Sequence, residues 1–246
     1  MVAIAVEPRA VNSEIVSLSE VRFAWPGRDA FALSIKRFVL PARERLLLIG
    51  PSGSGKSTFL GLICGILTPQ SGRIDILGTN IATMSAAARD RYRAEHFGIV
   101  FQMFNLLPYG TVIDNVLLPL SFAPERCRRV TARGPGEAEA QRLLTRLGLD
   151  AARVRRLTAA QLSVGQQQRV AVARALIGAP ELIVADEPTS ALDRNRQAAF
   201  LDLLFGEMSE AGATLIMVSH DESLAPRFDR VLRLDEIATS EESDRA

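Results

Sequence analysis

Residues 46–58 have the sequence LLLIGPSGSGKST, in which a continuous apolar run ends in a loop of glycines, serines and one lysine. The run from Leu46 to Ile49 predicts a strand that is buried on both faces, as the strands of parallel sheets are. A helix is expected to follow, from Lys56 to about Ile66. A strand, a glycine-rich loop and a helix in this order are the local structure of a phosphate-binding loop.

The loop carries the chemical groups that bind phosphates. Its glycines let successive backbone N–H groups turn inward, and the helix adds its positive N-terminal end beneath them. Lys56 is expected to reach the β- and γ-phosphates, and the Ser57 hydroxyl to ligate Mg²⁺. Lysine is rare in this arginine-rich chain, so its use here favours a site that needs an ammonium group. The predicted nucleotide-binding residues of the loop are Gly50, Pro51, Ser52, Gly53, Ser54, Gly55, Lys56, Ser57 and Thr58.

A second apolar run, Leu182 to Ala185, ends in two adjacent carboxylates. Asp186 is expected to hold Mg²⁺, directly or through water. Glu187, one residue further, can orient and deprotonate an attacking water. A strand that merely meets an acidic loop would look the same, but beside a phosphate-binding loop the pair predicts nucleotide hydrolysis.

Two further features would have a chemical role only beside a bound phosphate. The segment Leu162–Gln166, LSVGQ, opens a predicted helix from Gln167 to Ile177. Ser163 and Gly165 there offer a hydroxyl and free N–H groups as a second anion site, although Ser163 would also serve as a simple N-cap. His220 follows the apolar run Thr214–Val218, and at the end of a core strand it can reach the γ-phosphate region.

The remaining pattern predicts an α/β fold with a mainly parallel sheet. The segments Ile15–Ala24 and Phe31–Leu40 alternate apolar and polar residues around a Pro26–Asp29 turn, which predicts an N-terminal antiparallel β subdomain. The middle of the chain shows no strand pattern and predicts an inserted helical subdomain at about 103–178, containing the helix Glu137–Leu147. We expect a single domain over 1–246, with a flexible tail at 237–246.

Composition restricts the partners. The net charge of +1 argues against a broad basic surface, so no nucleic-acid partner is expected. The start of the chain lacks the features of a signal peptide, and the longest apolar runs are far shorter than the ~20 residues of a membrane helix. We therefore expect a soluble protein that reaches a membrane only through a partner.

Taken in order, these motifs resemble those of the ATPase subunits of ABC transporters, over about residues 15–235. The signature motif of that family corresponds to Leu162–Gln166, its switch glutamine to Gln102, its switch histidine to His220, and its dimer-contact loop to Ser190-Ala191-Leu192-Asp193. One position departs from the pattern, because Val164 stands where the signature usually has glycine. The segments 89–93, 97–108 and 115–120 further resemble the lipoprotein-release, macrolide-export and cell-division subfamily.

The resemblance implies a P-loop ATPase that binds ATP and Mg²⁺. It implies that two copies sandwich the nucleotides and drive a separate integral-membrane permease, at the cytoplasmic face of the inner (cell) membrane. Trp25 is the best match to the adenine-stacking aromatic residue, with Phe23 second. The implied roles are catalysis for Glu187, His220, Gln102 and Lys56, metal binding for Ser57, Gln102 and Asp186, and nucleotide binding across the dimer for Ser163, Gly165 and Gln166.

Two other classes of protein share part of this pattern. A soluble ABC-type ATPase that acts on DNA or ribosomes usually carries a long coiled coil or tandem ATPase domains, and this chain has neither. A P-loop kinase for a small molecule would leave Leu162–Gln166 and His220 without a role. The ABC transporter subunit is the interpretation that uses every motif.

Overall fold

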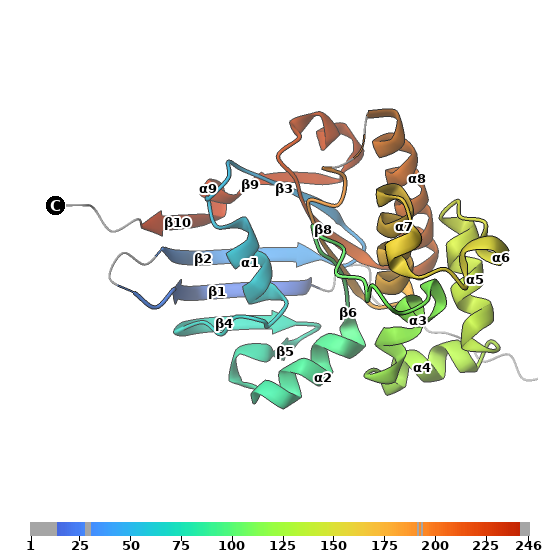
Figure 1. The fold of residues 1–246 in the computed structure, drawn as a ribbon. Helices are drawn as coiled ribbons and strands as arrows, with labels where there is room; N and C mark the ends of the chain where they lie inside the picture. Colours follow the sequence, from blue (N-terminus) through green and yellow to red (C-terminus); the bar gives the residue numbers. More distant parts are fainter. Residues whose placement is uncertain (1–13, 28–30, 191, 193, 242–246) are drawn as a thin grey trace, which may run out of the picture.

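The structure is a computed structural model, and it describes residues 14–27, 31–190, 192 and 194–241 (Figure 1). Its described strands form two five-stranded sheets. The antiparallel sheet has the order β10 (Ala238–Glu241), β2 (Ala32–Pro41), β1 (Glu14–Ala24), β4 (Ser71–Ile76), β5 (Thr79–Asn80). The parallel sheet has the order β6 (Phe97–Val100), β7 (Leu182–Asp186), β8 (Thr214–Val218), β3 (Arg45–Ile49), β9 (Arg230–Arg233).

Side chains of the parallel sheet alternate between two hydrophobic cores. In β3, Leu46 and Leu48 pack with α1 (Lys56–Ile63) and the antiparallel sheet. Leu47 and Ile49 point the other way, into a core shared with α7 (Val164–Leu176) and α8 (Arg194–Ala211). The continuous apolar run is therefore buried on both faces, as predicted.

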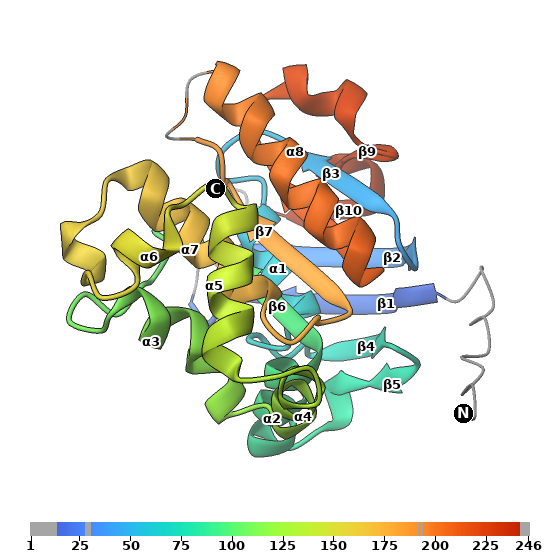
Figure 2. The ribbon, with the colours of Figure 1, turned by 90° about the vertical axis from the view of Figure 1, so that its right-hand side faces the viewer.

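The predicted helical insertion is present. Its helices are α3 (Val112–Leu117), α4 (Pro124–Thr131), α5 (Gly136–Arg146) and α6 (Ala151–Val154), and they lead into α7. They stand beside the parallel sheet and away from the antiparallel one (Figure 2). Between β6 and β7, the chain as described forms no strand, only one isolated bridge between Thr111 and Thr158.

Two predicted boundaries are wrong. Helix α1 ends at Ile63 and not near Ile66, because Gly65 adopts a left-handed φ of 64° that closes the helix. The predicted flexible tail at 237–246 is wrong for residues 237–241, which belong to α9 (Leu234–Ile237) and to β10. Strand β10 pairs antiparallel with β2, so backbone hydrogen bonds order a segment whose small polar side chains gave no strand pattern.

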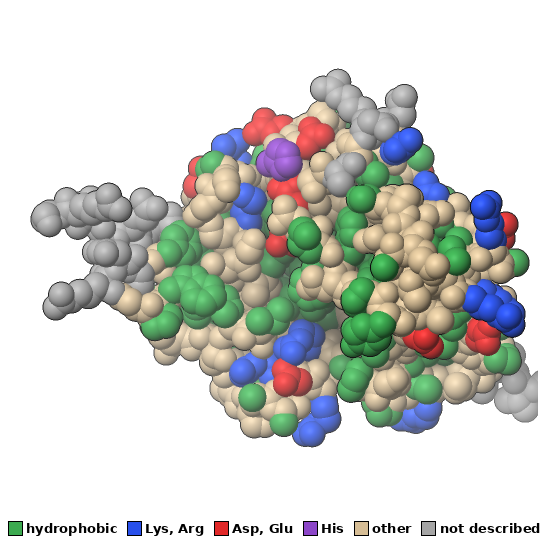
Figure 3. Space-filling model, viewed as in Figure 1, with side chains coloured by type: hydrophobic (Ala, Val, Ile, Leu, Met, Phe, Trp, Pro, Cys, Tyr) green, Lys and Arg blue, Asp and Glu red, His purple; other side chains and the backbone are tan. Residues whose placement is uncertain are grey.

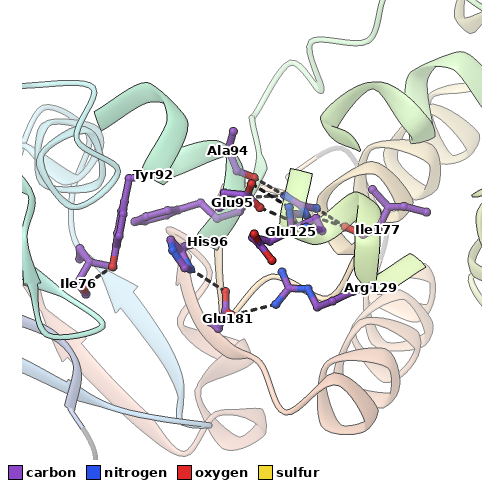
Figure 4. Close-up of polar contacts among 11 residues, drawn as sticks. Ile76, Tyr92, Ala94, Glu95, His96, Glu125, Arg129, Ile177 and Glu181 are labelled. Carbon is purple, nitrogen blue, oxygen red and sulfur yellow. Dashed lines mark hydrogen bonds and ion pairs between the residues drawn. The ribbon is translucent and has the colours of Figure 1, made fainter. Parts of the chain in front are cut away.

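One buried arginine joins the helical insertion to the core. The Arg126 side chain on α4 is only 1% exposed. Its guanidinium donates hydrogen bonds to the carbonyl oxygens of Ala94 (3.1 Å), Phe97 (2.9 Å), Ala175 (3.1 Å) and Ile177. These carbonyls lie near the ends of α2 (Ala86–His96) and α7, as part of the polar cluster in Figure 4. Burial lowers the pKa of Arg126 to about 10.

The same joint is completed by Glu95 of α2. Its carboxylate accepts the N–H groups of Glu125 (3.1 Å) and Arg126 (3.2 Å), and so caps the first turn of α4 (Figure 4). Side chain and cap together hold α4 against α2 and the end of α7.

We expect Arg126→Lys to lower the free energy of unfolding by about 2–4 kcal/mol, because one ammonium cannot satisfy carbonyls that a planar guanidinium reaches together. Urea denaturation of the purified protein measures this loss. The matched control is Arg128→Lys on the same helix, where the side chain is exposed and the effect should stay within about 0.5 kcal/mol. Equal losses in the two variants would contradict the role of Arg126 as a joint.

Candidate nucleotide site

The phosphate-binding loop connects β3 to α1, as predicted. Gly55 precedes α1 with a φ of 97°, and a Cβ there would lie 2.5 Å from Cζ of Phe31, so only glycine fits. The Lys56 ammonium donates to the carbonyl oxygens of Gly50 (2.7 Å) and Pro51 (2.6 Å). The loop therefore curls over the start of α1 with its lysine held inside the curve.

Two oxygen ligands suited to Mg²⁺ meet at the start of α1. The Ser57 hydroxyl donates to Asp186 Oδ2 at 3.2 Å. Adjacent ligands of an octahedral Mg²⁺, each at 2.0–2.1 Å, lie about 3 Å apart, so this spacing fits the ion. Burial raises the pKa of Asp186, although the Ser57 hydroxyl opposes the shift, and a bound cation would reverse it. Gln102, the third predicted ligand, is exposed and forms no hydrogen bond to either residue among the described parts of the chain.

The two predicted catalytic side chains face each other. The register of β7 with β8 places Asp186 opposite Val218, and the Glu187 N–H donates to the Val218 oxygen at 3.1 Å. Glu187 adopts a φ of 47°, in the left-handed region that is uncommon for glutamate. Its Oε2 lies 2.9 Å from Nδ1 of His220. The sequence predicted both residues near the γ-phosphate, but it did not predict their contact.

The aromatic residue upstream of the loop lies beside it. Trp25 is 45% exposed, and its Nε1–H donates to Oγ1 of Thr58 at 3.4 Å. Phe23 packs edge-on against Trp25 with ring centroids 5.3 Å apart, and it is only 8% exposed. Of the two candidates for stacking on adenine, Trp25 is thus the one with an accessible ring.

The signature segment forms an N-cap. Ser163 Oγ accepts the N–H of Gln166 at 3.4 Å, while Gln166 Oε1 accepts the N–H of Ser163 at 2.9 Å, which is a complete capping box for α7. Val164 is 53% exposed, and a Cβ added to Gly165 would meet nothing within 4 Å. Within the described residues of one copy, no hydrogen bond joins this segment to the phosphate-binding loop, so the two sites are separate in a single chain.

Three buried residues near the site were not predicted from the sequence. Arg174 of α7 donates to the carbonyls of Phe104 and Asn105, which follow Gln102 and have φ values of 58° and 47°. Gln168 of α7 donates to the Pro188 oxygen, and Gln197 of α8 donates to Thr189 and Asp221. Glutamines and arginines inside helices follow no recognisable motif, so no local signal could have identified them.

The predicted dimer-contact loop is described only in part. The N–H and the hydroxyl of Ser190 donate to the Glu187 carbonyl at 3.3 and 3.1 Å, and Leu192 packs at the edge of the helix-side core. Ala191 and Asp193 lie outside the described residues. The two hydrogen bonds from Ser190 to the Glu187 carbonyl show that the loop begins with a turn at Glu187.

Comparisons with known proteins agree with this geometry. The family model for ABC transporters matches residues 33–190. An uncharacterized ABC transporter ATP-binding protein of Escherichia coli K12, YbbA, is 44% identical over 200 residues, which cover 80% of this chain and 82% of YbbA. The lipoprotein-releasing system ATP-binding protein LolD of Chromohalobacter salexigens is 35% identical over 240 residues, covering 96% of this chain and 98% of LolD.

Solved structures support the same assignment. The dimeric structure of MJ0796, a bacterial ABC transporter cassette, matches with a TM-score of 0.75 and 32% identity, covering 94% of this chain and all of that one. A post-hydrolysis state of the same cassette, bound to ADP and Pi, matches with a TM-score of 0.73. No helix in the part of the chain that the structure describes is long and apolar enough to cross a membrane. The chain belongs to the ABC transporter family, as an ATP-binding subunit that hydrolyses ATP.

Proposed function

We propose that this subunit hydrolyses ATP at a site completed by a second copy of itself, and that it drives a separate membrane permease from the cytoplasmic face of the cell membrane. The contact between Glu187 and His220, next to the oxygen pair of Ser57 and Asp186, carries the hydrolytic part of the proposal. A carboxylate held by an imidazole beside a phosphate-binding loop is arranged to activate water.

Each residue then has a defined task. The loop N–H groups and Lys56 bind the β- and γ-phosphates, and Trp25 stacks on the adenine. Ser57 and Asp186 would hold Mg²⁺, with Gln102 as a further ligand, and the ion would neutralise charge on the phosphates. Glu187 takes the proton of the attacking water. His220, when both of its ring nitrogens carry protons, orients that carboxylate through Nδ1 and donates to the γ-phosphate through Nε2.

A second copy would supply the missing side of the site. Ser163, Gly165 and Gln166 lie at the open N-terminal end of α7, where free N–H groups and the helix dipole favour an anion. The exposure of Val164 and the open space around Gly165 leave this end accessible to another molecule. The solved MJ0796 cassette is a dimer, which supports pairing of two copies of this chain.

A permease would bind a surface of the helical insertion. The sequence favours the segment 104–120 and the helix 137–147 for this surface, because this region broken by prolines has more apolar residues than a small subdomain can bury. A groove of about 580 Å³, mainly apolar, is lined by residues of α2 and of the helical insertion, among them Arg91, Arg93, Leu118, Pro119 and Phe122. Figure 3 shows hydrophobic side chains beside arginines and lysines on this face of the molecule. Helix α5 takes no part in lining it, because α5 buries its apolar side against α3 and α7. We therefore place the permease helix in the groove between α2 and Phe122.

Site-specific photo-cross-linking in membranes tests this surface. A photoreactive amino acid at Phe122, which is exposed at the groove, should cross-link to a protein that mass spectrometry identifies as membrane-spanning. The matched control is Ala138, which is exposed on α5 in the same insertion and should give no such product. Cross-links from Ala138 alone would place the partner elsewhere, and ribosomal or DNA-bound products would favour the soluble class of ABC ATPase.

A further inference from the structure

A buried glutamine bridges the two loops that carry Glu187 and His220. Gln197 lies in α8 and is only 7% exposed. Its Nε2 donates to Oγ1 of Thr189 at 3.1 Å and to Oδ2 of Asp221 at 3.2 Å. Thr189 comes two residues after Glu187, and Asp221 comes directly after His220. The two N–H groups of one amide are therefore divided between the two loops.

The two loops start from paired strands, where the Glu187 N–H donates to the Val218 oxygen at 3.1 Å, and the amide joins them again further along. A hollow of about 550 Å³ lies between them, bordered by Thr189, Ser190, Ser219 and Asp221. Packing across that hollow is incomplete, so the amide adds a connection that side-chain packing does not supply there. Thr189 is itself buried, so the loss of its hydrogen-bond partner would be costly.

Other hydrogen bonds fix the shape of each loop. Gln168 of α7 donates to the Pro188 oxygen on the first loop. On the second loop, Asp221 accepts the Ser223 N–H at 3.0 Å and donates its own N–H to Ser219 Oγ at 3.1 Å. These bonds shape the loops one at a time, whereas Gln197 contacts both.

We propose that Gln197 is a positioning residue for ATP hydrolysis, which sets the contact between Glu187 and His220 by holding their loops at a fixed separation. This inference rests on the function proposed above for those two residues. Gln197 touches neither of them, so its effect passes through Thr189 and Asp221.

The test uses three variants of the full-length chain. Gln197→Met keeps the length of the side chain but removes both donors. Gln197→Glu keeps the shape but places a carboxylate against Asp221. The double variant Gln197→Glu with Asp221→Asn restores the bond with donor and acceptor exchanged, because the new amide can donate to the new carboxylate.

We expect each single variant at Gln197 to lower kcat about tenfold or more, the size of effect that one or two buried hydrogen bonds can have, with KM for ATP changed less than about twofold. The double variant should recover most of the lost rate. Fluorescence of Trp25, the only tryptophan, reports nucleotide binding separately, and it should titrate as in the wild type.

A wild-type kcat in Gln197→Met would overturn the proposal, and so would a loss of affinity as large as the loss of rate. If the double variant does not fold, Gln197→Met alone decides the question. Failure of the proposed function looks different, because normal turnover by Glu187→Gln and His220→Ala would remove the contact itself from catalysis, whatever Gln197 does.

Discussion

Glu187→Gln is expected to bind ATP but to release phosphate at least about 10²-fold more slowly than the wild type, and to accumulate as an ATP-bound dimer. The amide keeps the shape of the side chain and can still contact Nδ1 of His220, but it cannot accept the proton of the attacking water. A positioned general base contributes about 10²- to 10⁴-fold to a rate. Phosphate release and sedimentation, both with ATP and Mg²⁺, measure the two effects.

Glu222→Gln is the matched control for this experiment. Glu222 begins the turn two residues after His220, but its exposed carboxylate pairs with Arg233 at 3.0 Å. The same change there should leave turnover within about twofold, since an exposed ion pair contributes little. Normal turnover by Glu187→Gln would remove Glu187 from the role of base, and another group would have to activate the water.

The second large effect is expected at the signature segment. Ser163→Arg should nearly abolish turnover, because a long charged side chain at this exposed N-cap would block the approach of the second copy's γ-phosphate. Nucleotide binding to one copy should persist, since no hydrogen bond in the described residues joins Ser163 to the phosphate-binding loop. ATPase rate and Trp25 fluorescence, measured side by side, separate these two properties.

Val164→Gly, one residue further, is the matched control for Ser163→Arg. Val164 is the first residue of α7, where helical backbone has a negative φ, so valine fits without strain. Its exchange for the glycine usual at this position should change the maximal rate by less than about tenfold, or under ~1.4 kcal/mol of barrier. A large gain in rate would show instead that this valine holds the enzyme slow, and that the signature is not fully competent as it stands.

The phosphate-binding loop and its flanking elements could be predicted because their information is local. The run Leu46–Ile49 and the glycines after it specify strand and loop within a dozen residues. The carboxylates after β7 and the histidine after β8 were found in the same way, from their place at strand ends. Their contact could not be found, because it depends on the register that sets Asp186 opposite Val218.

Elements stabilised by distant partners were missed. Strand β10 has no apolar alternation and forms through backbone pairing with β2, some 200 residues earlier in the chain. The carbonyls around Arg126 come from segments 29 to 51 residues away, and the partners of Gln197 lie on two separate loops. The spacing of residues along the sequence does not predict contacts between segments so far apart.

The joint at Arg126 has a consequence for how the protein behaves in different solvents. Its guanidinium donates to backbone carbonyls, with the Glu95 and Glu181 carboxylates also stabilising its charge, and burial keeps dissolved ions away from it. Raising the ionic strength, which weakens surface ion pairs, should leave this connection intact. The guanidinium also stays protonated at neutral pH, since its lowered pKa is still about 10. The hydrogen bonds that join the helical insertion to the ATPase core should therefore persist when the salt concentration changes and when the pH varies around neutral.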